Sequence, residues 1–151
     1  MFKKALSQLA NLLPAEEVSA HCDGPCGVYD PASSRIAAEA VLSMTKKILD
    51  AGNPSDIAAK NTFARFVAIK EEQAQIAKDE LLILWTDYFK PPHLEQYPDL
   101  HTKFWNAAKL CSACKVEVSL EKAQSLMSAI EEIHKIFWAT KGRDVPYYTA
   151  S

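Results

Sequence analysis

The stretch from residue 21 to 31 carries more groups that could bind a metal than any other part of this chain. Within six positions it offers the imidazole of His21 and the thiols of Cys22 and Cys26. A Gly-Pro pair lies between the two cysteines and favours a turn that would point both sulfur atoms at one place. The segment therefore predicts a short metal-binding hook.

The spacing of the two cysteines in the hook does not identify the metal. Cys-x3-Cys beside one histidine suits half of a zinc site, a disulfide across a short loop, or a site for a soft transition metal. A second pair, Cys111 and Cys114, is spaced like a redox motif but lies in a helical pattern with no strand–helix–strand arrangement around it. Cys111 continues the apolar stripe that includes Phe104, so we expect both thiols to be buried and structural.

Composition limits the class of protein. The chain has 151 residues, of which 48% are hydrophobic, enough for one domain with a sizeable core. The net charge of −2 gives no general attraction for nucleic acid, and we expect no such partner. No apolar run reaches the roughly 18 residues of a membrane span, so we expect no membrane association. The two cysteine pairs do not resemble a secreted disulfide framework, which favours a reducing compartment.

Apolar residues recur at helical spacing in four segments, each bounded by a capping residue, a glycine or a proline. The segments run from about residue 33 to Gly52, from Ser55 or Asp56 to Pro91-Pro92, from Pro98 past Cys111, and from Leu120 to about Gly142. Four amphipathic helices with short connections predict an all-α fold, an antiparallel four-helix bundle over about residues 33–141. The N-terminal hook would precede the bundle, and residues 143–151 would form an irregular tail.

Residues 1–20 look like a leader. They form a short amphipathic pattern that ends in Val18-Ser19-Ala20, which resembles a signal-peptidase site. Polar residues interrupt the apolar region, however, and Glu16-Glu17 lie close to the cut. We therefore expect a cytoplasmic protein rather than an exported one.

The string His-Cys-Asp-Gly-Pro-Cys-Gly-Val-Tyr at residues 21–29 closely resembles the N-terminal hook of the nickel superoxide dismutases, whose mature chain begins at that histidine. The resemblance continues in Trp-Thr-Asp-Tyr-Phe-Lys-Pro-Pro-His at 85–93, in Tyr97-Pro98 and in Lys-Ile-Phe-Trp at 135–138. It covers essentially the whole chain after residue 20. The resemblance implies a superoxide dismutase with one nickel ion per subunit, assembled as a homohexamer.

The family resemblance also implies the nickel ligands. They are the thiolates of Cys22 and Cys26, the backbone nitrogen of Cys22, the α-amine of His21 and, in the oxidised state, the His21 imidazole. Thiolates stabilise the higher oxidation state, so nickel can cycle between Ni(II) and Ni(III) while superoxide becomes dioxygen and hydrogen peroxide. His21 has a free α-amine only after cleavage behind Ala20. We therefore expect residues 1–20 to be a propeptide removed by a maturation protease, leaving 21–151 as the enzyme.

Three further residues are candidates for catalysis by the same resemblance. Tyr29 would gate the open face of the metal or belong to a proton network. Tyr88 and Lys90 would line the approach, where a local cation attracts superoxide despite the acidic total charge.

The chain departs from the family pattern around the axial imidazole. In familiar members a glutamate and an arginine that orient this ring fall where this chain has Ala37 and Gln73. Loss of both partners together leaves other polar residues to hold the His21 ring. The candidates are Glu39, Glu71, Glu72 and Gln73 itself.

Other functions explain less of the sequence. A nickel or copper carrier could use the same hook without turnover, whereas a structural helical protein would leave the hook unexplained. A di-iron bundle needs two Glu-x-x-His motifs, and only Glu131 to His134 forms one. We expect His134 to make a hydrogen bond in or beside the core, and His93 and His101 to be loop or helix-surface residues. The tryptophans, expected to fill core or interface, are Trp85, Trp105 and Trp138.

Overall fold

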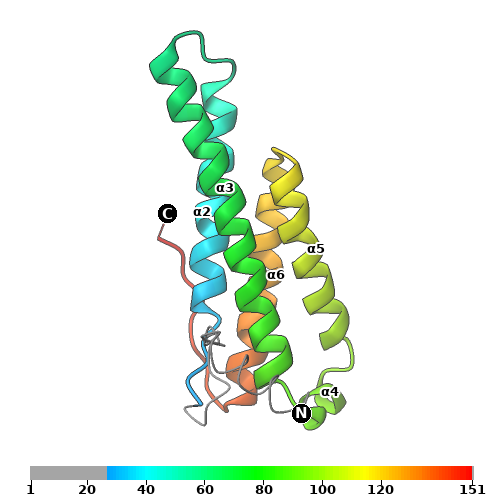
Figure 1. Cartoon of the computed structure of the whole chain (residues 1–151). Helices are drawn as coiled ribbons and strands as arrows, with labels where there is room; N and C mark the ends of the chain where they lie inside the picture. The colour runs from blue at the N-terminus through cyan, green and yellow to red at the C-terminus, as the bar shows by residue number, and fades with distance from the viewer. Residues whose placement is uncertain (1–26, 151) are drawn as a thin grey trace, which may run out of the picture.

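The computed structural model describes residues 27–150, and every regular element in that range is helical (Figure 1). The long helices are α2 (Ala32–Ala51), α3 (Ile57–Ile83), α5 (Leu100–Val116) and α6 (Leu120–Thr140). A π-helical segment, η1 (Leu84–Tyr88), continues α3, and the short helix α4 (Pro91–Gln96) leads into α5. The four long helices pack as an antiparallel bundle, so the predicted fold class is confirmed.

Local sequence explains where the long helices begin and end. The Asp56 carboxylate accepts a hydrogen bond from the Ala59 backbone N–H at 2.8 Å, so Asp56 rather than Ser55 caps α3. The Ser119 hydroxyl caps α6 in the same way through the Lys122 N–H, at 3.2 Å. These caps satisfy donors that have no partner within the helix.

The second predicted helix ends differently from the expectation. It was expected to run to Pro91-Pro92, but the structure changes to π-helix at Leu84 and ends at Tyr88. The Phe89 N–H donates to the Leu84 carbonyl at 3.2 Å, a five-residue spacing that widens the last turn. The two prolines instead begin α4, because the first residues of a helix need no N–H partner.

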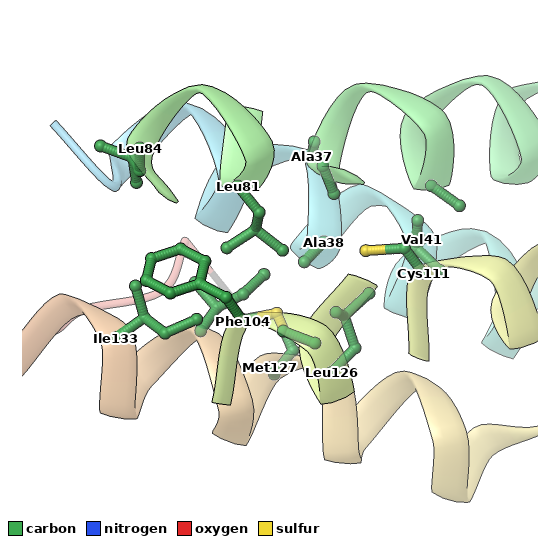
Figure 2. Packing of buried hydrophobic residues seen from close by; sticks show 14 of the residues in the cluster. Ala37, Ala38, Val41, Leu81, Leu84, Phe104, Cys111, Leu126, Met127 and Ile133 are labelled. Carbon is green, nitrogen blue, oxygen red and sulfur yellow. The ribbon is translucent and has the colours of Figure 1, made fainter. Parts of the chain in front are cut away.

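One apolar face from each long helix forms the core (Figure 2). Ala38 of α2, Leu81 of α3 and Ile133 of α6 are fully buried in this core. Phe104 of α5 lies in the same core with 3% exposure. Removing these apolar surfaces from water supplies the main driving force for the fold. None of the helices in the described range combines the length and apolar character needed to cross a bilayer.

A buried lysine caps the C-terminal end of α5. Lys70 of α3 is 1% exposed, and its ammonium donates hydrogen bonds to the carbonyls of Cys114, Lys115 (2.9 Å) and Glu117 (3.2 Å). These carbonyls belong to the C-terminal end of α5, which carries partial negative charge. Burial lowers the pKa of Lys70, while the nearby Glu71 carboxylate opposes that shift.

Residues 143–150 form neither helix nor strand, yet they are held against the bundle. His134 Nε2 donates to the Val145 carbonyl at 2.8 Å, which confirms the expected hydrogen bond beside the core. The Tyr147 hydroxyl donates to the Met127 carbonyl at 3.4 Å. Val145 and Tyr147 pack on the hydrophobic core, so the tail is an integral part of the folded chain.

The tail contacts predict a pH dependence of stability. Burial raises the pKa of Tyr147 to about 12 from 10.0, although Arg35 opposes the shift. Between pH 10 and 12 the unfolded chain loses this proton while the folded chain keeps it, so stability falls as pH rises. We expect a loss of about 1–2 kcal/mol, measured by urea unfolding across this range. Tyr147→Phe, which has no titrating hydroxyl, should show a flatter dependence; equal slopes would contradict this account.

Candidate functional site

The predicted nickel ligands His21, Cys22 and Cys26 lie outside the described residues. The described chain begins at Gly27, directly after Cys26. Gly27 has φ +64°, a left-handed conformation that glycine adopts without the steric cost of a side chain. A glycine at this position therefore suits a sharp turn between the hook and α2.

The described residues do not form a competing metal site. Within 27–150 no group of three or more His, Cys, Asp or Glu side chains could hold a metal ion, so these residues form no di-iron site. Cys111 and Cys114 are buried, as expected, at 0% and 3% exposure. Burial raises the pKa of Cys111 to about 12 and also raises that of Cys114, so both remain protonated thiols near neutral pH.

The remaining donor set suits nickel. The chain has four cysteines, and the two buried ones are unavailable as thiolates. That leaves Cys22 and Cys26, with His21 beside them. Two sulfur and several nitrogen donors within six residues favour a soft transition metal over a hard cation such as Mg²⁺.

Two of the predicted site residues, Tyr29 and Tyr88, lie together. Tyr29 precedes α2 and Tyr88 ends η1, and their ring centroids are 5.7 Å apart. The Tyr88 ring also packs on Phe137 at 4.5 Å and against the edge of Phe89 at 5.0 Å. Both tyrosines are half-buried, so one edge of this aromatic cluster remains open to solvent.

Lys90 lies two residues beyond Tyr88 and is exposed. Its backbone N–H donates to His93 Nδ1 at 3.1 Å, and the His93 N–H donates to the Lys90 carbonyl at 2.9 Å. The His93 ring stacks nearly parallel to the Tyr88 ring, with centroids 5.6 Å apart. These contacts fix the backbone of Lys90 next to the aromatic cluster, while its ammonium reaches solvent.

Sequence reasoning missed the contribution of α6 to this cluster. The Tyr88 hydroxyl lies 2.6 Å from Thr140 Oγ1, and the Lys141 ammonium lies 5.3 Å from the Tyr88 ring centroid. Thr140 and Lys141 lie two and three residues after the Lys-Ile-Phe-Trp segment at 135–138. Their closeness to that segment was the available signal, but only the folded chain shows what they contact.

Two surface hollows differ in their relation to the cluster. One, of about 210 Å³, lies between residues 28–30 and the end of α3, where Ser33 and Glu80 line it. Tyr29 borders this hollow. A larger polar hollow of about 520 Å³ lies between α5 and α6 and is bordered by none of the predicted site residues.

The positions that depart from the family pattern have different environments. Ala37 is 2% exposed and belongs to the hydrophobic core (Figure 2). Gln73 is half-buried on α3, whereas Glu71 and Glu72 are exposed. A charged side chain in place of Ala37 would need a buried partner, and Gln73 carries no charge to supply one.

Glu39, another candidate, contacts Arg35 and the C-terminal tail. Its carboxylate pairs with Arg35 at 3.4 Å, and both side chains are largely buried, at 12% and 7% exposure. The same carboxylate accepts a hydrogen bond from the Ala150 N–H at 2.7 Å, and the Arg35 guanidinium lies 4.6 Å from the Tyr148 ring centroid. This ion pair therefore holds the C-terminal tail.

Comparison with known proteins agrees with the hook chemistry. The sequence model of the family described as nickel-containing superoxide dismutase matches residues 16–141. The chain belongs to this family. It is 48% identical to the nickel superoxide dismutase of Streptomyces seoulensis and 45% identical to that of Streptomyces coelicolor. Each match spans 128 residues, 85% of this chain and 93% of the relative.

Solved structures of the family share the fold. A crystal structure of nickel-containing superoxide dismutase with nickel ligation of the oxidised state gives a TM-score of 0.73 at 45% identity. The native nickel superoxide dismutase structure gives 0.73 at 42% identity. Both matches cover 82% of this chain and all of the solved chain.

Family membership gives the reaction and the cofactor. The protein is an oxidoreductase that converts superoxide to dioxygen and hydrogen peroxide, and nickel is its cofactor. The predicted activity is thus confirmed, and the carrier function is not favoured. Residues 142–151 lie beyond the family match, so the whole tail at 143–150 is outside it.

Burial of the core thiols predicts their chemical behaviour. In the folded, metal-free protein, iodoacetamide should leave Cys111 and Cys114 unmodified, because only an exposed thiolate reacts readily. Peptide mass spectrometry measures this, and the same peptides should become labelled after unfolding in urea. The double variant Cys111→Ala with Cys114→Ala should retain its nickel content. Loss of nickel from that variant would place these thiols at the metal.

Proposed function

We propose that His21, Cys22 and Cys26 hold the nickel ion, at a site that exists only after a maturation protease cuts behind Ala20. An α-amine has a reference pKa near 8, so a metal can displace its proton near neutral pH, whereas an acylated nitrogen offers no comparable lone pair. The unavailability of Cys111 and Cys114 supports this assignment.

The main support for the proposal is the position of Tyr29, which is close to Cys26 in the sequence. Three peptide units separate Cys26 from Tyr29, and they span at most about 11 Å between Cα atoms. Tyr29 in turn lies 5.7 Å from Tyr88, ring to ring. The covalent chain therefore tethers a proposed ligand near the aromatic cluster and near Lys90, which directly precedes α4.

Nickel, when bound, supplies one electron to a superoxide ion and takes one from another, so two superoxide ions and two protons give dioxygen and hydrogen peroxide. The chain's own residues make this efficient. The thiolates of Cys22 and Cys26 ease oxidation of the metal. Tyr29 and Tyr88 limit access and order hydrogen bonds near it, and the Lys90 ammonium attracts the anionic substrate.

The His21 imidazole would need a different support in this chain from the one that the family pattern implies. Ala37 is in the core and offers no polar group to the His21 ring, so a polar residue at another position supports the ring in our proposal. A related solved structure is described with nickel ligation for an oxidised state and another for partial reduction. We propose that the His21 imidazole binds only in the oxidised state here.

A one-residue extension tests the role of the α-amine. A chain that begins at His21 should bind one nickel ion and consume superoxide. A chain that begins at Ala20 keeps the same imidazole and thiols but has an amide at His21, so superoxide should decay near the buffer rate. Nickel content and superoxide consumption are measured side by side. Equal activity of the two chains, or active enzyme that retains Met1, would refute the proposal.

Cysteine variants separate the enzyme from a carrier. Cys22→Ser and Cys26→Ser should each lose nickel and activity, because a hydroxyl is a poor ligand for a soft metal. A carrier would retain nickel in the unmodified chain but leave superoxide at the buffer rate. These variants also serve as controls for the one-residue extension.

We also propose a homohexamer located in the cytoplasm. The α2–α3 hairpin projects beyond α5 and α6 (Figure 1) and exposes Ile57 at 82% and Leu49 at 49%. A hollow of about 390 Å³ beside Phe63 and Phe66 adds apolar surface that neighbouring subunits would cover. Native mass spectrometry of the His21 chain counts the subunits. A reducing compartment preserves the two thiolates, and cell fractionation tests the location.

A charge variant tests the role of Lys90. Lys90→Gln should lower kcat/KM for superoxide by about threefold at low salt, because it removes one solvent-screened attraction of about 0.7 kcal/mol. The difference should shrink as salt is raised. Lys109→Gln is a matched control, since Lys109 lies over Trp105 on α5, outside the cluster. A salt-independent loss in Lys90→Gln would show that the side chain does not act by attraction.

A further inference from the structure

The last turn of α6 controls the hydroxyl group of Tyr88. The Tyr88 hydroxyl and Thr140 Oγ1 are 2.6 Å apart, and Thr140 Oγ1 is also 2.6 Å from the Phe137 carbonyl oxygen. These three groups form a short chain of hydrogen bonds that joins η1 to α6. Tyr88 and Thr140 are 52 residues apart in the sequence.

The number of available protons fixes which group donates in each of these two hydrogen bonds. A carbonyl oxygen can only accept, so the single hydroxyl proton of Thr140 is donated to Phe137. Thr140 then has no proton left for Tyr88 and must accept. The phenolic proton of Tyr88 therefore points at Thr140, and only the lone pairs of its oxygen remain for other partners.

The Tyr88 ring itself has little freedom to turn. Phe137 and Phe89 contact it at centroid distances of 4.5 and 5.0 Å, and His93 stacks on it at 5.6 Å. The Lys141 ammonium adds a cation–π contact at 5.3 Å. With the ring held, the torsion of the hydroxyl is the main freedom left, and Thr140 sets it.

We propose that Thr140 is a positioning residue that holds Tyr88 as a hydrogen-bond acceptor toward the site. Superoxide is an anion that accepts hydrogen bonds, so Tyr88 cannot donate to it without giving up Thr140. Water and hydrogen peroxide do carry protons to donate. Tyr88 thus orients a water molecule rather than binding the anion, which is left to the cation of Lys90. This inference rests on the proposed placement of nickel beside Tyr29 and Tyr88.

Two substitutions of Thr140 test the hydrogen bond directly. Thr140→Val keeps the shape and removes the acceptor, and Thr140→Ser restores it. The readout is the tyrosine Fermi doublet in the Raman spectrum of the metal-free protein, whose intensity ratio distinguishes a donating phenol from an accepting one. Subtraction of the Tyr88→Phe spectrum isolates the Tyr88 signal. We expect a strong-donor signal in the parent, its loss in Thr140→Val and its return in Thr140→Ser.

The catalytic readout uses the same variants after nickel loading. Thr140→Val should lower kcat/KM for superoxide by about two- to tenfold at unchanged nickel content, and Thr140→Ser should recover it. Thr45→Val is the matched control, because the Thr45 hydroxyl likewise donates to a carbonyl of its own helix, Val41 O at 2.8 Å, but lies on α2 away from Tyr88. It should change neither readout.

The outcomes separate this inference from the proposed function. A Tyr88 Raman signal that is the same in the parent and Thr140→Val overturns the inference, whatever the activity. A changed signal with unchanged kcat/KM also overturns it, because the hydrogen bond would then have no role in the reaction. A wrong assignment of the nickel ligands would appear instead as nickel retained by Cys22→Ser, and it would leave the metal-free Raman result intact.

Discussion

Burial of one apolar face on each of the four long helices is the constraint that brings the site together. Because successive helices run in opposite directions, the start of α2, the end of α3, the start of α5 and the end of α6 meet at one end of the bundle (Figure 1). Tyr29 lies just before α2, Tyr88 ends η1 and Thr140 ends α6, while Lys90 directly precedes α4, which connects α3 to α5. Core residues such as Leu81 and Ile133, which never contact substrate, therefore set the distances within the cluster.

The features that could be predicted from sequence are those that depend on local chemistry. Helical spacing of apolar residues locates α2, α5 and α6, and the capping residues Ser55 and Asp56 signal the start of α3, where the structure selects Asp56. The apolar stripe through Phe104 predicts that Cys111 is buried. The hook was found because an imidazole, two thiols and a Gly-Pro turn rarely occur together by chance, and this string identified the family before any fold was known.

The features that could not be predicted depend on contacts between distant segments. The π-helical turn that positions Tyr88 differs from an α-helix by one hydrogen-bond register, and no residue type specifies it. The bond between Tyr88 and Thr140 requires α3 and α6 to be packed already. The burial of Lys70 is likewise not apparent from the sequence, because its ammonium is held by carbonyls at the end of α5, a helix distant in the chain.

The C-terminal tail also determines where additions to the chain can be made. Residues 143–150 run back along the bundle, and Ala150 ends beside Glu39 in the body of α2 (Figure 1). An affinity tag or reporter fused behind Ser151 would thus emerge from the side of the bundle, well away from Tyr29 and Tyr88. A fusion placed before residue 1 would be lost with the proposed leader, and one joined directly to His21 would turn into an amide the nitrogen that the metal is proposed to use. An affinity tag for purifying this enzyme should therefore be placed at the carboxyl terminus.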